Sequence, residues 1–398
     1  MGTSLSVDGC APIHIFASDR CWIEGETTRQ LNAVAALPGV IRVAAMPDMH
    51  PGRYGPVGCA TLARDIHPEF VGADIGCGMG LFALDVAARK LRPDKAAERL
   101  RVLGEPWGGD TAARLAGAGV PSTSYDASLG SIGGGNHFCE LQAVESLFDP
   151  GLAARHGIDA DAAFVLVHSG SRGLGFSILT RLLAAGLVTL NPATAAGTDY
   201  LADHGIAVRW AALNRRIIAE RAAAALRTSA RIINDLGHNL AEVTLAGVLH
   251  RKGAAAADRG QVPVPGSRGT LSYLVEPLAA SRPETLASIA HGAGRKYDRS
   301  SMHGRVTAKK PDLARLVRNP YGGVVVCEDR NLLIEEAPDA YKDISRVIGD
   351  LEAFGLARVV ASFRPLVTFK SVQQAEKRER VQHRDKHFVD KRDREDWR

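Results

Sequence analysis

Several histidines lie in short motifs rich in glycine or basic residues, a setting that suits metal binding or phosphate chemistry. They are His50 in PDMHPG, His137 in GGGNHF, His168 in VLVHSGSRG, His250 in LHRKGA and His291 in HGAGR. The segment VGADIGCGMG adds Asp74 and Cys77, three residues apart in a glycine-rich turn that would let both side chains face one ion. Each motif alone has an ordinary structural explanation, such as a hydrogen-bonded loop histidine. Together they supply the thiolate, imidazole and carboxylate ligands of a transition-metal site.

The glycine-rich loop GSIGGGNHFCE, at residues 130–140, ends in Asn136 and His137. It does not match the dinucleotide-binding fingerprint, and it lacks the Lys and Ser or Thr that end a Walker loop. A metal held by His137 could neutralise a phosphate in place of that lysine. The glycines would then let backbone N–H groups approach the remaining phosphate oxygens.

Basic residues follow three of these histidines: Arg172 after His168, Arg251 and Lys252 after His250, and Arg295 and Arg299 after His291. Arginine presents a planar fork to phosphate oxygens, and lysine a point charge. A metal ringed by such cations indicates phosphoryl or nucleotidyl transfer, in which charge on the phosphorus oxygens must be neutralised. Ligand softness by itself favours zinc, because a thiolate with imidazoles suits that ion.

Composition places the chain among ordinary globular proteins. It has 398 residues, of which 45% are apolar, and a mild net charge of +5 that permits a nucleic-acid or nucleotide partner without requiring one. Six cysteines are too few for a disulfide scaffold in a chain of this length, so we expect a reducing, cytoplasmic location. We find no secretory signal and no apolar stretch of bilayer length, and therefore expect no membrane association.

Hydrophobic patterns predict a mixed α/β (α+β) domain with a central β core and surrounding helices, filling residues 1–370. The expected strands include 43–46, 57–62, 81–84, 164–168, 271–275, 324–327 and 366–369. The expected helices include 208–234, which is rich in alanine, and 338–354.

The composition changes after Lys370. Residues 371–398 hold nine Lys or Arg and seven Asp or Glu, with little apolar content. We interpret them as a charged C-terminal tail outside the core, either helical or disordered, that is solvated or used for an interaction.

Eight motifs occur in the order found in the RtcB family of RNA ligases, and the resemblance runs from about Met46 to Lys370. These motifs are PDMHPG, VGADIGCGM, SLGSIGGGNHFCE, HSGSRG, HRKGA, PGSRGTLSY, HGAGR and EEAPDAYKDI. The resemblance implies an RtcB-like fold and a GTP-dependent ligase. Such an enzyme joins RNA with a 2′,3′-cyclic phosphate or 3′-phosphate to a 5′-hydroxyl end, in RNA repair or tRNA splicing.

The same resemblance assigns roles to individual residues. His291 would be the guanylylated nucleophile, Asp48 would orient it, and Asn136 would touch the GTP phosphates. The implied ligands of two Mn²⁺ ions are Asp74, Cys77, His137, His168 and His250, with Cys77 as the bridge. The implied guanosine contacts are Glu140, Ser267, Ser272, Tyr341 and Lys370, and the implied contacts to RNA or triphosphate oxygens are Arg172, Lys252, Arg295 and Arg299. Manganese replaces the zinc that softness favours, since metal availability often outranks affinity.

Two features depart from the family pattern. Asp298 precedes Arg299 where the family usually has serine, and its carboxylate would repel an RNA phosphate. The chain also continues for 28 residues beyond Lys370, where the family normally ends. The tail, together with the compact length of the chain, indicates a divergent bacterial branch of the family.

Two other functions stay open. A metal-dependent phosphoesterase would use the same Asp/Cys/His site with water as the nucleophile, and would need neither His291 nor Lys370. A non-catalytic RNA-binding paralogue would keep only the fold and the basic rim. The sequence does not name the RNA substrate or an accessory activator, and it leaves the oligomeric state open, a monomer included.

Overall fold

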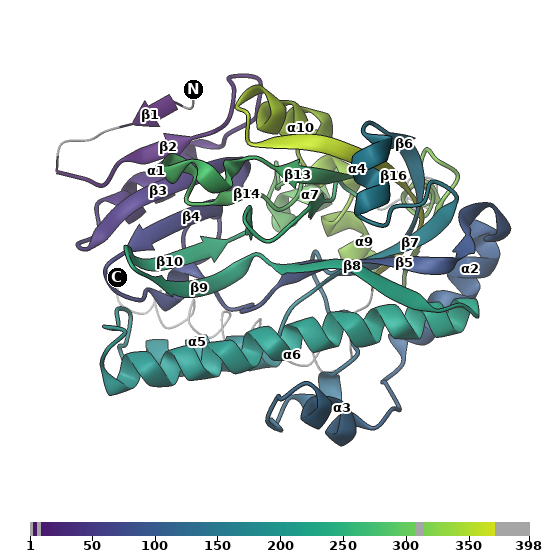
Figure 1. Ribbon diagram of the computed structural model, residues 1–398, viewed down its shortest axis with the longest axis horizontal. Coiled ribbons are helices and arrows are strands. Elements are labelled where there is room, and N and C mark those ends of the chain that lie inside the picture. Colours follow the sequence, from purple (N-terminus) through teal and green to yellow (C-terminus); the bar gives the residue numbers. More distant parts are fainter. Residues whose placement is uncertain (1–2, 6–8, 307–313, 371–398) are drawn as a thin grey trace.

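Strands form the centre of the molecule and helices lie around them (Figure 1). The computed structural model describes residues 3–5, 9–306 and 314–370. The predicted mixed α/β class, with a central β core and surrounding helices, is confirmed. The tail predicted at 371–398 lies outside the described residues, so the domain boundary at Lys370 stays a prediction.

The first sheet has six strands in the order β1-β2-β3-β4-β10-β9, with antiparallel neighbours except for the parallel pair β2 and β3. Its strands are β1 (Thr3–Leu5), β2 (Ile13–Ile15), β3 (Val40–His50), β4 (Val57–Ala63), β9 (Asn239–Thr244) and β10 (Gly247–Lys252). A short antiparallel pair, β11 (Ala254–Ala256) and β14 (Ser288–Ala290), packs against β3 and β4 of this sheet. The carboxyl ends of β3 and β14 therefore bring the PDMH and HGAGR motifs to one place.

The second sheet follows the order β12-β13-β16-β6-β7-β5-β8, and β15 pairs with β16 in parallel. Its strands are β5 (Gly78–Ala87), β6 (Phe138–Leu147), β7 (Ala162–Ser169), β8 (Ala230–Gly237), β12 (Val262–Val264), β13 (Ser272–Pro277), β15 (Val324–Cys327) and β16 (Ala357–Lys370). The central strands are buried on both faces, as their near-continuous apolar sequences require.

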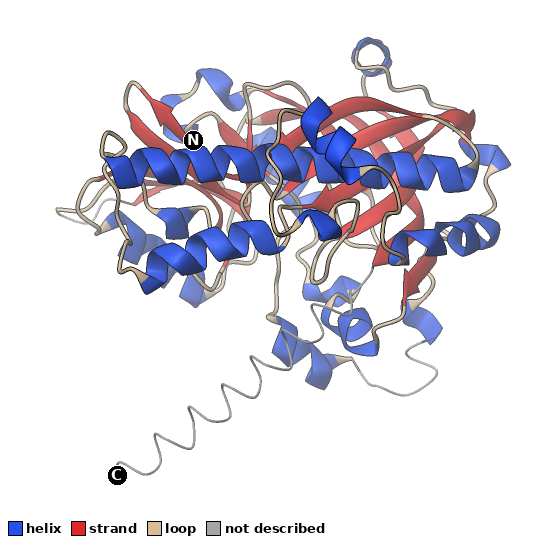
Figure 2. Ribbon diagram, turned by 90° about the horizontal axis from the view of Figure 1, so that it is seen from below, coloured by secondary structure: helices blue, strands red, loops and turns tan. Residues whose placement is uncertain are grey.

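Helices cover the sheets on several sides. They are α1 (Gly25–Ala35), α2 (Pro93–Leu100), α3 (Thr111–Gly117), α4 (Pro150–Arg155), α5 (Gly173–Ala184), α6 (Ala195–Leu226), α7 (Arg299–Arg305), α9 (Arg330–Glu335) and α10 (Ile344–Ala353). Helix α6 runs the length of one face, from below β9 and β10 to below β5 and β8, with α5 beside it (Figures 1 and 2). The described residues contain no helix that is both long enough and apolar enough to cross a membrane.

Each predicted strand overlaps a strand of the structure, but both predicted helices had wrong boundaries. The helix predicted at 208–234 starts earlier and ends at Leu226, where Arg227 adopts the left-handed conformation with φ of 61°. The residues after it, including Ile232, belong to β8, in keeping with the strand preference of β-branched side chains. The helix predicted at 338–354 is a 3-10 turn at Pro338–Ala340 followed by α10.

Two adjacent polar residues of α6, Asn214 and Arg215, reach through the core to loops outside the helix. Arg215 is 2% exposed; its Nη1 donates to the carbonyl oxygens of Gly76 at 2.7 Å and Ser169 at 2.9 Å. Its Nε donates to Asp235 Oδ1 at 2.5 Å. Asn214 accepts from the backbone N–H of Gly130 at 2.6 Å. The helix thus holds the loops that carry the singled-out motifs.

Replacing Arg215 by methionine should lower the free energy of unfolding by about 3–5 kcal/mol, because it leaves the buried Asp235 carboxylate without its cation. The double variant Arg215→Met/Asp235→Leu should recover a large part of that loss, since no charge remains to be compensated. Urea denaturation followed by circular dichroism measures both. A loss below about 1 kcal/mol in the single variant would show that the pair does not support the core.

Candidate active site

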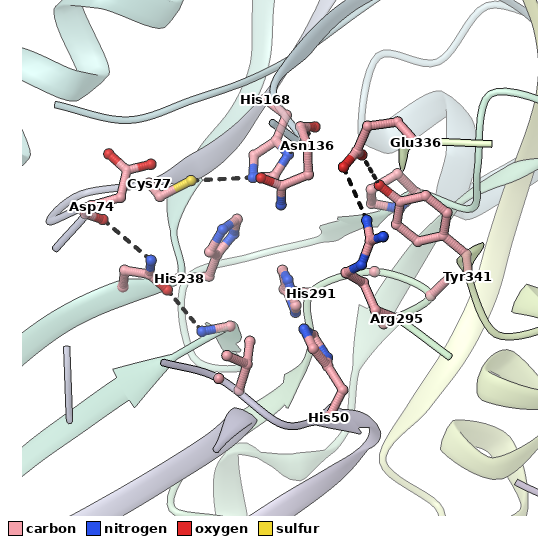
Figure 3. A pocket seen from close by; sticks show the side chains of 18 of the residues that line it. His50, Asp74, Cys77, Asn136, His168, His238, His291, Arg295, Glu336 and Tyr341 are labelled. Carbon is pink, nitrogen blue, oxygen red and sulfur yellow. Dashed lines mark hydrogen bonds and ion pairs between the residues drawn. The ribbon is translucent and has the colours of Figure 1, made fainter. Parts of the chain in front are cut away.

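A cavity of about 600 Å³ collects most of the residues singled out in the sequence (Figure 3). Its lining includes Asp74, Cys77, Asn136, Glu140, His168, Lys252, Ser267, His291, Arg295, Arg299, Tyr341 and Lys370. These residues come from strands, strand ends and connecting loops of both sheets. Their convergence is therefore a product of the tertiary structure.

Cys77 lies at the centre of two groups of potential metal ligands. In one group it is joined by Asp74 and His137, and in the other by His168 and His238, with the ligand atoms of each group within 4.8 Å of one another. The Cys77 Sγ lies 3.3 Å from His137 Nε2 and 3.2 Å from His168 Nε2. The Cys77 sulfur thus belongs to both groups of potential metal ligands.

The surroundings of these ligands also fit a metal. Asp74 Oδ1 is buried and has no hydrogen-bond partner among the described residues, while Oδ2 lies 2.8 Å from His137 Nε2. His168 Nδ1 lies 3.3 Å from the carbonyl oxygen of Asn136, to which it can donate, so its Nε2 can present a lone pair to the cavity. Burial acts against the charged form of Asp74, but His137 and Arg172 lower the pKa of this carboxyl below its usual value.

His238, which the sequence analysis did not single out, belongs to this site. It lies between β8 and β9, and its backbone N–H donates to the Cys77 carbonyl oxygen at 2.7 Å. Its ring centroid lies 5.2 Å from that of His168 and 4.5 Å from that of His291. The sequence does contain a signal for His238, because this histidine follows Gly237, as His137 follows a glycine cluster. The predicted helix at 208–234 ended just before it, and the strand β8 was not expected there.

His250, one of the predicted metal ligands, does not lie with the residues grouped around Cys77. Its Nε2 accepts from the backbone N–H of His67 at 2.9 Å, and its Nδ1 lies 3.3 Å from the Thr61 carbonyl oxygen, to which it can donate. Burial lowers the pKa of His250 to about 3, so the ring is neutral. The His250 side chain is 1% exposed and packs against His67 and Phe70, and both of its nitrogens have protein partners.

The glycine loop before His137 packs against a cation. Arg172 Nη1 donates to His137 Nδ1 at 3.1 Å, and a Cβ atom at Gly133 would lie 1.8 Å from that same Nη1. Glycine is therefore required at position 133, where φ is 98°, so that the guanidinium can reach the ligand. The loop makes room for an arginine instead of ending in a phosphate-binding lysine.

His291 lines the cavity and is held from behind by Asp48. Asp48 Oδ2 accepts from the backbone N–H of His291 at 3.0 Å and from its Nδ1 at 2.6 Å. Asp48 is fully buried. With Nδ1 protonated and held, Nε2 carries the lone pair and is free to act as a nucleophile. Gly253 makes this possible, because a Cβ there would lie 2.9 Å from His291 Cε1.

A buried carboxylate, Glu336, organises the opposite wall, and its role was not predicted. Arg295 Nη1 lies 2.9 Å and Arg299 Nε 3.2 Å from Glu336 Oε1, and the Tyr341 hydroxyl donates to Oε2 (Figure 3). Lys370 Nζ lies 3.7 Å from Oε2. Burial opposes its ionisation, but Lys370, Arg299 and Arg295 together lower the pKa of Glu336 to about 2.

This carboxylate changes what the predicted phosphate-binding arginines can do. Arg295 donates with Nη1 to Glu336, with Nη2 to the Glu335 carbonyl oxygen at 2.9 Å and with Nε to the Tyr297 carbonyl oxygen at 3.0 Å. Its guanidinium is thus held by the protein. The side chain of Arg299, in contrast, is 46% exposed and retains open donors.

The remaining predicted residues lie in or behind the cavity wall. Glu140 accepts from Thr368 Oγ1 at 2.5 Å and from Gln142 Nε2 at 2.8 Å. Ser272 lies behind it and accepts from the same Gln142 nitrogen at 3.0 Å, outside the cavity lining. Lys252 Nζ donates to the Gly55 carbonyl oxygen at 3.0 Å. Burial raises the pKa of Glu140 to about 7 and lowers that of Lys252 to about 8.

Comparison with known proteins agrees with this geometry. The family model described as tRNA-splicing ligase RtcB matches residues 30–105 and 117–371. The chain belongs to the RtcB family. It is 41% identical over 368 residues to the RNA-splicing ligase RtcB2 of Escherichia coli, a match that covers 90% of this chain and 96% of that protein.

More distant members of the RtcB family match over similar lengths. The chain is 31% identical over 432 residues to the RNA-splicing ligase RtcB of Mycobacterium tuberculosis, covering 85% of this chain and 99% of the relative. It is 28% identical over 466 residues to the tRNA-splicing ligase RtcB of Nanoarchaeum equitans, covering 90% and 95%. The resemblance stated from the motifs is confirmed, and family membership supports activity as an RNA ligase.

Asp298, where this chain departs from the usual RtcB pattern, caps helix α7. Its Oδ1 accepts from the backbone N–H of Ser301 at 2.9 Å and from the hydroxyl of Ser300 at 2.5 Å. These hydrogen bonds lower the pKa of the carboxyl. An N-cap role for aspartate accounts for this residue locally, although Asp298 also lines the cavity.

The two histidines His238 and His250 provide a matched test of the metal site. Replacing His238 by alanine should weaken manganese binding by about 10–100-fold, the cost typical of a lost ligand contact or its support. Replacing His250 by alanine should leave metal affinity close to that of the parent and lower stability instead, because it removes a buried hydrogen-bond acceptor. Isothermal titration with Mn²⁺ and thermal unfolding measure the two effects. If His250→Ala weakened manganese binding and His238→Ala did not, His250 and not His238 would be the metal ligand.

Glu140 predicts a pH-dependent stability. Its pKa is raised from an ordinary value near 4.5 to about 7, so the folded state favours the protonated carboxyl. The associated stability is fully present below the unfolded pKa and is lost as pH rises through about 7. Glu140→Gln should therefore be nearly neutral at acidic pH and stabilising at alkaline pH, by up to about 3 kcal/mol. Equal effects on the free energy of unfolding at both pH values would contradict the buried, protonated carboxyl.

Proposed function

We propose that this protein is an RNA ligase that joins an end with a 2′,3′-cyclic phosphate or 3′-phosphate to a 5′-hydroxyl end, with GTP as co-substrate. The observation that carries the proposal is the His291–Asp48 pair, which lies in one cavity with the Cys77 ligand groups. A phosphoesterase, whose nucleophile is water, would not need a histidine whose Nε2 is kept unprotonated for attack. The pair thus favours nucleotidyl transfer through a histidine.

His291 would attack the α-phosphorus of GTP through Nε2. A P–N bond forms, pyrophosphate leaves, and the ring becomes positively charged. Asp48 keeps the proton on Nδ1, so that no proton has to leave the attacking nitrogen, and its carboxylate stabilises the charged ring. A neutral imidazole held in this tautomer is the reactive form.

The remaining steps would pass GMP to RNA. An oxygen of the RNA 3′-phosphate attacks the guanylyl phosphorus and breaks the P–N bond, returning His291 to its neutral form. The 5′-hydroxyl of the second RNA end then attacks the RNA phosphorus, GMP leaves, and a phosphodiester bond forms. An end that carries a cyclic phosphate is first opened by water.

Asp74, Cys77, His137, His168 and His238 would hold Mn²⁺. Bound manganese would neutralise charge on the phosphate oxygens and activate the water that opens a cyclic phosphate. The soft ligand set alone would also accept zinc, and the choice of manganese rests on membership of the family.

The nucleotide would lie along the wall opposite the metal ligands. We propose that Glu140, Ser267, Ser272, Tyr341 and Lys370 contact guanosine, Ser272 through the Gln142 side chain that it shares with Glu140. Asn136 would contact the GTP phosphates. Arg172, Lys252 and Arg299 would contact triphosphate or RNA oxygens, while Arg295, bound to Glu336, would mainly shape the wall.

The cellular setting follows from the thiols. All six cysteines are free, including Cys77, which must stay reduced to bind metal. We therefore place the protein in a reducing cytoplasm. The oligomeric state stays open, and the site as described is built from one chain.

A labelled-GTP assay tests the proposal directly. Incubation with α-labelled GTP and Mn²⁺ should give a covalent GMP adduct that survives a denaturing gel. His291→Ala should abolish the adduct, and Asp48→Asn should slow its formation by at least about 100-fold, because the wrong tautomer is favoured. His156→Ala, a histidine that pairs with Glu276 away from the cavity, serves as the matched control.

The chemistry of the adduct separates the alternatives. A P–N bond should be labile in acid and stable in alkali. An adduct that persists in the His291→Ala protein, or that maps to a lysine such as Lys252, would refute the histidine mechanism. Absence of any adduct in the parent protein would favour a phosphoesterase.

A further inference from the structure

A second cavity, of about 570 Å³, lies on the other side of the wall that carries Arg295 and Tyr341. That wall is a short antiparallel bridge between Arg295 and Tyr341, closed by hydrogen bonds from Lys296 N–H to the Ala340 carbonyl oxygen and from Lys342 N–H to that of Gly294. Successive side chains of an extended segment point to opposite faces. Arg295 and Tyr341 line the first cavity, and their neighbours Lys296 and Lys342 line the second.

The second cavity combines an exposed aromatic ring with an excess of positive charge. Trp22, in the loop before α1, is 50% exposed although it is a large apolar side chain. The charged lining residues are Arg20, Lys296, Lys342 and Arg346 against Asp19 and Asp343. A volume of this size is within the range of small-ligand sites, about 300–1,000 Å³, so one nucleotide fits.

The aromatic and cationic side chains alternate across the rim. Lys296 Nζ lies 5.8 Å from the centroid of the Trp22 ring and 5.1 Å from that of Tyr297. The guanidinium carbon of Arg305 lies 3.7 Å from the Tyr297 centroid. Such interleaving is typical of surfaces that bind single-stranded nucleic acid, where bases stack on the rings and the backbone follows the cations.

The basic residues of the second cavity differ in how many hydrogen bonds and ion pairs they form with the protein. Lys342 is buried and donates to the carbonyl oxygens of Pro47 at 2.8 Å and Met49 at 2.7 Å, so it supports the strand that carries Asp48. Arg346 is exposed; its Nη1 donates to the Arg20 carbonyl oxygen at 2.8 Å, and its Nε lies only 3.8 Å from Asp343. Within the part of the chain that the structure describes, no carboxylate forms an ion pair with Lys296, which leaves its ammonium available to a phosphate.

We propose that this second cavity is an RNA subsite that takes an unpaired nucleotide of a substrate strand, with the base stacked on Trp22 and phosphates against Lys296 and Arg346. The inference rests on the proposed function, because it supposes that RNA enters the first cavity. A strand that leaves the reacting centre over the Arg295–Tyr341 wall meets Lys296 next. The subsite would hold a nucleotide a few positions from the reacting end.

Fluorescence anisotropy with labelled single-stranded RNA, without GTP, tests the site. Trp22→Ala should weaken binding of a longer strand by about tenfold, which is the loss expected for one stacked base. Trp22→Phe should retain most of the affinity, because the ring is kept. Lys296→Gln should weaken binding and reduce the dependence of log affinity on log salt by about one unit. A dinucleotide, too short to reach the second cavity, should be insensitive to Trp22→Ala.

Phe148→Ala, which removes another exposed aromatic ring at the end of β6, is the matched control and should leave RNA affinity unchanged. The experiment uses a 3′-phosphate strand and a 5′-hydroxyl strand separately, and a loss with either supports the site. Unchanged affinity for both strands in a folded Trp22→Ala protein, or an equal loss in Phe148→Ala, would overturn it.

Formation of the GMP adduct by the parent protein is measured in parallel, since that step involves no RNA. RNA binding that depends on Trp22 in a protein that forms no adduct would refute the ligase mechanism and leave the subsite standing. If the parent protein forms the adduct but the Trp22→Ala substitution does not change RNA affinity, the subsite is refuted and the ligase mechanism stands.

Discussion

The buried guanidinium of Arg215 is the constraint on which the active site depends. It binds the carbonyl oxygen of Gly76 next to Cys77, that of Ser169 next to His168, and the carboxylate of Asp235 in β8, three residues before His238. One side chain thus fixes three segments that carry metal ligands. A charge buried this deeply is stable only when its hydrogen bonds are satisfied, so the three segments cannot move independently without a large free-energy cost.

The close packing of these segments explains several of the glycines. The ligand loops must approach one another without space for side chains, and a Cβ at Gly170 would overlap the Asp74 carboxylate at 2.1 Å. Gly133 gives Arg172 access to His137 in the same way. The glycine-rich motifs are therefore needed for the assembly of the metal and histidine groups, and not only for contact with phosphate.

Charge balance divides the cavity into two regions. Around Cys77 lie Asp74, His137, His168 and His238, whereas the opposite wall concentrates Arg295, Arg299 and Lys370 around Glu336. Glu336 limits the repulsion among these cations and fixes the positions of Arg295 and Tyr341. The same wall separates the cavity lined by Cys77 and His291 from the basic cavity at Trp22, so a change in this wall can affect both cavities.

The sequence by itself determined the family, the α+β class and most of the chemically active residues, because ordered motifs such as HGAGR and DIGCGM carry that information locally. It did not determine which histidines meet. His238 and His250 both stand near glycine or basic residues, and only the tertiary structure decides that one lies beside Cys77 while the other packs against His67 and Phe70. Nor could it reveal Glu336 as the partner of two arginines, since ion pairs between distant segments leave no local pattern. The predicted helix ran past Leu226 to residue 234 because the sequence pattern did not show where the helix ends. The tertiary pairing of β8 with β5 decides that the residues from Ala230 onward form a strand.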